Sequence, residues 1–174
     1  MPTGQTALIL PVPEAEPLVH TWRARFDKHA AQGVPAHVTL LSPFLPEAAA
    51  RAALPRVLGL LGRRTPRFTF RALVRWPGLA VLRPEPDDWF RRITRALCEA
   101  HGLLPYAGKH GTTFEPHLTV AYGAEVPALT RARFDAIAAD LDPRLPLTCV
   151  GRQVQLIVRE GQRWRLAEAL EIAP

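Results

Sequence analysis

The sequence predicts a mixed α and β fold built from two similar halves. Segments with the patterns of strands and of helices alternate along the chain, and each half carries a His-x-Thr strand followed by a helix. The length of 174 residues suits one compact domain or two small halves that share a core. Hydrophobic residues make up 48% of the chain, which is enough for such a core.

The elements follow from hydrophobic periodicity and from turn residues. The predicted strands cover residues 6–12, 36–42, 67–76, 79–83, 117–122, 147–150, 153–159 and 163–170. The predicted helices cover residues 14–29, 46–61, a stretch that starts near Asp87 and includes Leu97, and 128–141. Residues 102–114, which are rich in glycine, are expected to form a loop.

Two predicted helices contain features that test these boundaries. In the first, Leu18, Trp22 and Phe26 recur on one face, and Arg23 is expected to lie elsewhere. In the second, Pro55 costs about 3 kcal/mol in a helix interior, so we expect a kink or a restart there.

The segment 67–76 has the clearest alternation of a strand. One predicted face is apolar and carries Phe68, Phe70, Ala72, Val74 and Trp76. The other face carries Arg67, Thr69, Arg71, Leu73 and Arg75. Pro77-Gly78 then suits a tight turn into the next strand.

Two tetrapeptides carry the candidate chemistry: 37–40 (His-Val-Thr-Leu) and 117–120 (His-Leu-Thr-Val). In a strand, residues i and i+2 point to the same face, so each histidine projects together with its threonine. A neutral histidine can accept a proton while a second, protonated histidine donates one, because the unperturbed pKa of imidazole is about 6.5. The threonine hydroxyls, with arginines, can bind phosphate oxygens. The set therefore suits phosphodiester cleavage, with His37 and His117 as acid and base and Thr39 and Thr119 as phosphate ligands, and the scheme requires no metal or other cofactor.

The chain resembles the 2H phosphoesterase superfamily, also called 2′-5′ RNA ligase-like or cyclic phosphodiesterase proteins. The stretches 35–44 (PAHVTLLSPF) and 114–121 (FEPHLTVA) carry the resemblance, and the order of elements is similar over nearly the whole chain. The resemblance implies a single bilobal α+β domain over residues 1–174, with two antiparallel sheets facing a central cleft and helices outside. It also implies metal-independent action on 2′,3′-cyclic or 2′-5′ phosphodiesters of RNA ends or nucleotides.

The sequence departs from the family pattern at Tyr122. Many RNA-acting members carry an arginine there, in a pattern like His-x-Thr-x-x-Arg, so RNA ligation is less expected than hydrolysis. A tyrosine could stack on a base or bind a phosphate. The expected partners are RNA termini or small nucleotides with a cyclic phosphate, and we expect a monomer.

Other side chains are candidates for substrate binding. Arg71 and Arg75 could neutralise a phosphate if their strand face lines the cleft, or they could be ordinary surface charge. Lys109, with His110, could close over the substrate from its loop, or the loop could simply be solvated. The four tryptophans are expected to pack in or near the core, although one at the rim of the cleft could stack a base. No spacing among the six histidines predicts a metal site.

The composition adds further expectations. A formal charge of +6 favours anionic partners, although arginine-rich composition can also have a genomic origin. Two cysteines without metal or redox spacing, no long apolar run and no signal-like N-terminus predict a cytoplasmic protein away from membranes. Two functional alternatives stay open: an RNA- or nucleotide-binding module without catalysis, and a purely structural role for the two strand motifs.

Overall fold

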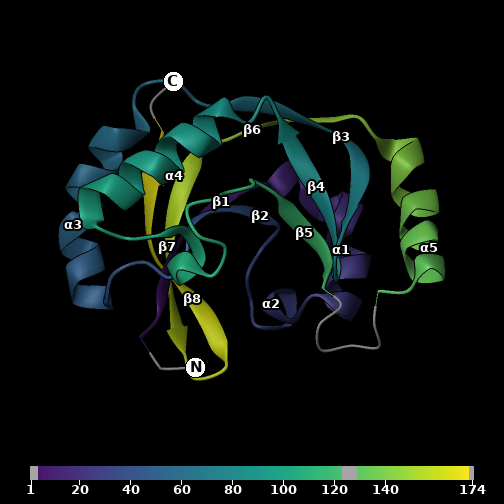
Figure 1. Ribbon diagram of the computed structural model, residues 1–174, viewed down its shortest axis with the longest axis horizontal. Coiled ribbons are helices and arrows are strands. Elements are labelled where there is room, and N and C mark those ends of the chain that lie inside the picture. The colour runs from purple at the N-terminus through teal and green to yellow at the C-terminus, as the bar shows by residue number, and fades with distance from the viewer. Residues whose placement is uncertain (1–3, 123–128, 173–174) are drawn as a thin grey trace.

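A computed structural model of the protein describes residues 4–122 and 129–172. Its strands form two four-stranded antiparallel sheets with helices around them, which confirms the predicted α+β class (Figure 1). One sheet has the order β2-β1-β7-β8, with β1 (Thr6–Pro11), β2 (His37–Leu41), β7 (Gln153–Glu160) and β8 (Arg163–Glu171). The other has the order β5-β4-β3-β6, with β3 (Arg67–Trp76), β4 (Leu79–Glu85), β5 (Leu118–Tyr122) and β6 (Leu147–Val150).

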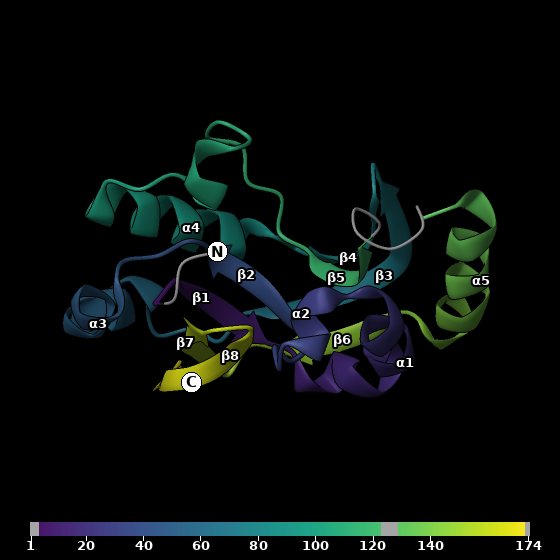
Figure 2. The same ribbon diagram turned by 90° about the horizontal axis from the view of Figure 1, so that it is seen from below.

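The helices lie at the two ends of the molecule and against the second sheet. The α-helices are α1 (Glu16–Phe26), α2 (Lys28–Ala31), α3 (Glu47–Leu61), α4 (Asp88–His101) and α5 (Arg131–Leu141). Short 3₁₀ turns are η1 (Pro13–Ala15), η2 (Pro105–Gly108) and η3 (Asp142–Arg144). Helices α3 and α4 lie beside the first sheet and α5 lies beyond the second, while α1 packs against β5 (Figures 1 and 2). Ala128, the predicted start of the last helix, lies outside the described residues.

A single large apolar cluster joins the two sheets. It includes Leu10 and Val38 from the first sheet together with Leu82, Leu118 and Val120 from the second, all fully buried. Strands β2 and β5 are each at the edge of their sheet, and they lie against each other where the sheets meet. The shared core therefore fixes the two His-x-Thr strands relative to one another.

The predicted first helix is broken into pieces by Asp27. Its backbone is extended, and its carboxylate accepts the N–H of His29 at 2.9 Å, so Asp27 caps α2 and ends α1. The burial of Arg23 was not predicted: its side chain lies one turn beyond Val19 on the inner side of α1. Burial is tolerated because Asp27 and a backbone carbonyl bind the guanidinium.

Pro55 was expected to kink the second predicted helix or to make it restart, and no restart occurs. Helix α3 runs from Glu47 to Leu61 as one helix with Pro55 inside it, and Pro46 precedes its first turn. Its buried side chains, Ala50, Val57 and Leu61, continue on both sides of the proline. Packing of this apolar side against the core therefore outweighs the cost of the proline.

The alternation predicted for residues 67–76 changes phase in the middle of β3. The pairing with β4 moves from Phe70 opposite Pro84 to Leu73 opposite Leu82, so β3 carries one extra residue. As a result Leu73 is buried and Ala72 is exposed, the reverse of the prediction. Trp76, which was expected to share a face with Phe68, is turned to the opposite face.

Candidate active site

The two histidines occupy equivalent positions at the starts of the two adjoining edge strands. His37 is the first residue of β2, and His117 immediately precedes β5, which begins one residue later than the predicted strand. In each motif the apolar residues, Val38 and Leu40 or Leu118 and Val120, are fully buried. The histidine and threonine of each motif alternate with them and remain partly accessible.

Each imidazole is oriented by its own backbone in the same way. Nδ1 of His37 lies 2.7 Å from the carbonyl oxygen of Pro35, and Nδ1 of His117 lies 2.7 Å from that of Glu115. A carbonyl can only accept, so Nδ1 carries the hydrogen in both rings. Nε2 of each neutral ring is then the unprotonated nitrogen, which is the atom able to accept a proton from a substrate.

Burial makes both histidines harder to protonate. It lowers the pKa of His37 to about 4, and the charge of Arg23 adds to this effect while the bond to Pro35 opposes it. Burial also lowers the pKa of His117, where the carbonyl and the carboxylate of Glu115 oppose the change. Although both residues keep some solvent contact, the free protein holds both rings neutral near pH 7.

The bulge in β3 brings an unexpected residue to the site. In the register of the second sheet, Thr119 lies opposite Val81 and Val81 lies opposite Val74, so Val74 and Trp76 share the face of Thr119. The Trp76 ring accordingly contacts the His117 ring edge-on, with centroids 4.8 Å apart. The sequence predicted strict alternation and so missed this contact; nothing in the pattern marks the extra residue.

Tyr122 lies at the end of β5 and connects the two halves. Its ring is 5.3 Å from Nζ of Lys28, the first residue of α2. This is a distance at which an ammonium group is attracted to an aromatic face. Tyr122 pairs with Leu79, two residues from Val81, so it belongs to the same face as Thr119.

The two arginines proposed for substrate binding, Arg71 and Arg75, lie on different faces of β3. Arg71 donates from Nε to Glu85 at 2.8 Å, and both side chains are exposed. Arg75 lies opposite Ala80, which is part of the core, and it donates to the carbonyl oxygen of Leu129 at 3.3 Å. The expectation that Arg71 and Arg75 share a face was therefore wrong, because the bulge lies between them. Lys109 and His110 are exposed, and His110 contacts the ring of Tyr106.

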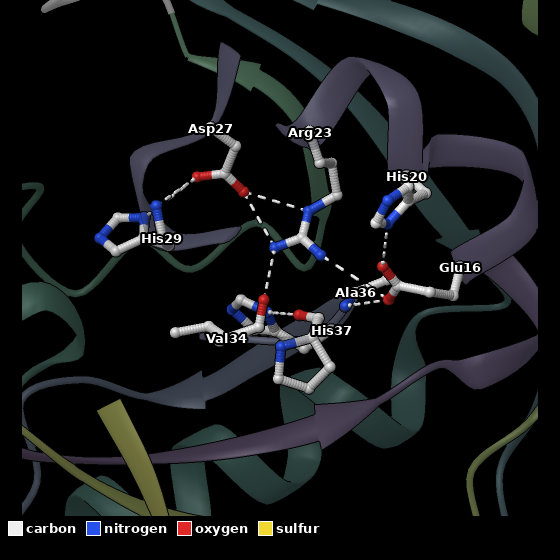
Figure 3. Close-up of polar contacts among 9 residues, drawn as sticks. Glu16, His20, Arg23, Asp27, His29, Val34, Ala36 and His37 are labelled. Atoms are coloured by element: carbon white, nitrogen blue, oxygen red, sulfur yellow. Dashed lines mark hydrogen bonds and ion pairs between the residues drawn. The ribbon is translucent and has the colours of Figure 1, made fainter. Parts of the chain in front are cut away.

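The segment before His37 is held by a buried network that Figure 3 shows. Arg23 donates from Nε and Nη2 to Oδ2 of Asp27 at 3.1 and 3.0 Å, and from Nη2 to the carbonyl oxygen of Val34 at 3.1 Å. Glu16 accepts the N–H of Ala36 at 2.7 Å. The spacing of Arg23 and Asp27, four residues apart, was a sequence signal for such a pair.

The segment before His117 has its own network at the surface. Arg91 donates to the carbonyl oxygen of Phe114 at 2.6 Å, to Asp87 at 2.8 Å and to Glu115 at 2.8 Å. Arg83 also donates to Glu115, at 3.1 Å. Asp87 and Arg91 are again four residues apart, but Glu115 is distant in sequence, so only the tertiary structure joins the set.

Three further observations concern metal-binding groups, membrane-spanning helices and cysteines in the described part of the chain. Within residues 4–122 and 129–172, no three or more His, Cys, Asp or Glu side chains are grouped so that they could hold a metal ion. Among the helices that the structure describes, none has the length and apolar character needed to cross a membrane. Both cysteines are free thiols; Cys149 is buried and Cys98 is half-buried.

The fold and the paired motifs together define a class of α+β protein with two antiparallel sheets and one His-x-Thr strand at the facing edge of each. The chain belongs to the 2′-5′ RNA ligase superfamily, whose family model matches residues 11–163. This agrees with the 2H phosphoesterase resemblance of the sequence.

Solved structures share this fold over their full length. Escherichia coli LigT in complex with 3′-AMP is 16% identical, with a TM-score of 0.61 over 99% of this chain and 100% of LigT. LigT in complex with ATP is 13% identical, with a TM-score of 0.60 over 100% of both chains. The Thermus thermophilus protein TT0787 is 17% identical, with a TM-score of 0.55 over 97% of both. No match was found among the curated proteins.

Proposed function

We propose that this protein is a metal-independent phosphodiesterase that acts on 2′,3′-cyclic phosphate or 2′-5′ phosphodiester bonds of RNA ends or nucleotides. One observation carries the proposal: both imidazoles donate Nδ1–H to a carbonyl two residues earlier. This arrangement sets both rings in the same tautomer and leaves two Nε2 atoms for proton transfer. A purely structural role would not require the same arrangement twice.

Hydrolysis of a cyclic phosphate needs two proton transfers, and two histidines supply both. Water attacks phosphorus while the neutral histidine takes a proton from it. The bond from phosphorus to the 2′ or 3′ oxygen breaks, and the protonated histidine gives its proton to that oxygen. Thr39 and Thr119 donate hydrogen bonds to the non-bridging oxygens, where negative charge increases in the transition state. The product is a phosphomonoester, and solvent returns the two histidines to their starting states.

Local charges support His37 as the base and His117 as the acid. The charge of Arg23 disfavours protonation of His37 and is only partly offset by that of Asp27, whereas the carboxylate of Glu115 favours protonation of His117. The anionic phosphate of a bound substrate raises the pKa of both rings, and the ring beside Glu115 is then the more readily charged. Both rings are mainly neutral before substrate binds.

Aromatic and cationic side chains near the motifs suit a nucleotide substrate. Trp76 and Tyr122 share the face of Thr119, and Lys28 lies over Tyr122. Bases stack on such rings, and E. coli LigT, which has the same fold, was solved in complex with ATP and with 3′-AMP. Lys109 and Arg71 are exposed and could contact a longer RNA, whereas Arg75 is bound to the backbone on the other face.

The experiment is a product-identified screen of 2′,3′-cyclic nucleotides, RNA with a cyclic phosphate end and 2′-5′-linked oligoadenylates, with and without EDTA. We expect hydrolysis that EDTA does not inhibit, and a fall in kcat of about 10²- to 10⁴-fold for His37→Ala and for His117→Ala. Circular dichroism checks that both variants fold. Near wild-type turnover by either variant would refute the two-histidine mechanism.

The pH dependence gives a second readout of the same scheme. Because the pKa of both histidines is lowered in the free protein, kcat/KM should be bell-shaped with both limbs below pH 6.5. The kcat profile, which reports the substrate complex, should lie at higher pH because the phosphate raises both pKa values. Salt-dependent RNA binding without any product would instead indicate the binding module.

A further inference from the structure

The residues that precede the two histidines are held by matching contacts from two different helices. Arg23 of α1 donates to the carbonyl oxygen of Val34 at 3.1 Å, and Arg91 of α4 donates to that of Phe114 at 2.6 Å. Each carbonyl is three residues before a histidine. Each arginine is also bound to an aspartate one helical turn away, Asp27 or Asp87.

The arginine contacts act on the peptides 34–35 and 114–115, which directly precede the peptides that orient the two rings. The carbonyl that accepts from Nδ1 belongs to the next peptide along, 35–36 or 115–116. Because a peptide is planar, a contact that holds the N–H of this peptide also restrains its carbonyl. In the first half, Glu16 accepts the N–H of Ala36, which is the N–H of the same peptide whose carbonyl accepts from His37.

The second half restrains the equivalent peptide by different means. Pro116 has no N–H for a carboxylate to hold, and its ring fixes φ instead. Glu115 is bound by Arg91 at 2.8 Å and by Arg83 at 3.1 Å, so the residue that offers the carbonyl is also anchored through its side chain. The outcome is the same in both halves: a fixed acceptor 2.7 Å from Nδ1.

We propose that Arg23 with Glu16, and Arg91, are positioning residues that fix the carbonyl acceptor of each histidine and thereby its tautomer and ring orientation. This inference rests on the proposed function only for its effect on catalysis. The effect on the tautomer can be measured without a substrate. The arginines do not touch the reacting atoms in this scheme; they act through residues 34–36 and 114–116.

The direct test is the ring ¹⁵N NMR spectrum of histidine-labelled protein, which distinguishes Nδ1–H from Nε2–H tautomers. In the wild type, we expect both His37 and His117 as the Nδ1–H form. Arg91→Met should give mixed tautomers for His117 and leave His37 unchanged. The matched control is Arg95→Met, the same substitution one turn further along α4, which should change neither histidine.

The first half is tested with three variants because Arg23 is buried and its loss alone would leave Asp27 without the guanidinium. Arg23→Met/Asp27→Leu removes both charges together, so that neither is left buried alone. Glu16→Met removes the acceptor of the Ala36 N–H, while Glu16→Gln keeps an oxygen that can accept it. We expect mixed tautomers for His37 in the first two proteins and the wild-type form in Glu16→Gln. If the double variant does not fold, Glu16→Met decides the result for this half.

Steady-state kinetics test whether the positioning of His117 matters for catalysis. On a substrate found by the screen, Arg91→Met should lower kcat by about tenfold or more with little change in KM, and Arg91→Lys should not restore it, because one ammonium cannot replace the three contacts. A wild-type tautomer at His117 in Arg91→Met would overturn the proposal, whatever the rate. Mixed tautomers in a protein that cleaves no substrate would support the positioning role and refute only the proposed function.

Discussion

The side-chain networks that hold the segments before His37 and before His117 make similar contacts but differ in solvent exposure. In the network that holds the segment before His37, the side chain of Arg23 is 2% exposed and that of Asp27 is 1% exposed. In the network that holds the segment before His117, the side chain of Arg91 is 36% exposed and that of Glu115 is 42% exposed. A buried charge left without its partner is far more costly than one in water, so the two halves should respond differently to the same change. The network before His37 should therefore contribute strongly to folding stability, whereas the network before His117 should contribute little.

The largest expected difference is in stability. Arg23→Met removes the guanidinium partner of the buried Asp27 carboxylate, which keeps its contacts with His29, and it should lower the free energy of unfolding by about 3–5 kcal/mol. Arg91→Met breaks contacts that water can replace, and it should cost about 1 kcal/mol or less. Urea unfolding followed by circular dichroism measures both, and Arg23→Met/Asp27→Leu should recover much of the loss. Equal losses for the two single variants would show that exposure does not distinguish the two halves.

A smaller effect should appear in the pH dependence of stability. The pKa of His37 is about 4 in the folded protein and near 6.5 when unfolded, so the unfolded chain takes up the proton first as the pH falls. The free energy of unfolding should therefore decrease as the pH falls from about 6.5 to about 4, with little further change from this group below pH 4.

His37→Gln removes this titration and should flatten that part of the curve. The measurement is urea unfolding between about pH 4 and pH 8 for the wild type and the variant. His117→Gln should act in the same direction, because the pKa of His117 is also lowered. A wild-type curve parallel to that of His37→Gln over this range would contradict the lowered pKa.

The smallest effect concerns the contact between Trp76 and His117, at a ring distance of 4.8 Å. An aromatic contact is worth about 0.5–1.5 kcal/mol, so Trp76→Leu should lower kcat/KM by roughly two- to tenfold. Trp89→Leu is the control, because the ring of Trp89 contacts Phe90 instead of a histidine. If both variants lower kcat/KM equally, the ring contact has no particular role.

Much of the fold and the composition of the motifs could be predicted because they depend on local pattern. Period-2 alternation placed His37 with Thr39 and His117 with Thr119, and the buried residues between them confirm those strands. The turn at Pro77-Gly78 also follows from residue type, and Gly78 has the positive φ that such a turn requires. The catalytic roles of the four motif residues remain predictions until the variants are assayed.

The features that the sequence did not predict depend on contacts between distant segments and not on local pattern. The extra residue in β3 is a matter of pairing with β4, and it alone determines that Trp76 meets His117 while Arg75 turns away. Burial of Arg23 depends on a carbonyl at Val34, which no helical pattern contains. In both cases the deciding partner lies on another segment.

The sequence by itself determined which side chains can do chemistry and which neighbours share their strand face, because these follow from residue type and a two-residue repeat. The tertiary structure alone decided that the two edge strands meet, that a bulge brings a tryptophan to one histidine, and that an arginine binds the carbonyl oxygen three residues before each histidine. Such contacts depend on how segments far apart in the chain are packed, and local periodicity contains no information about that packing.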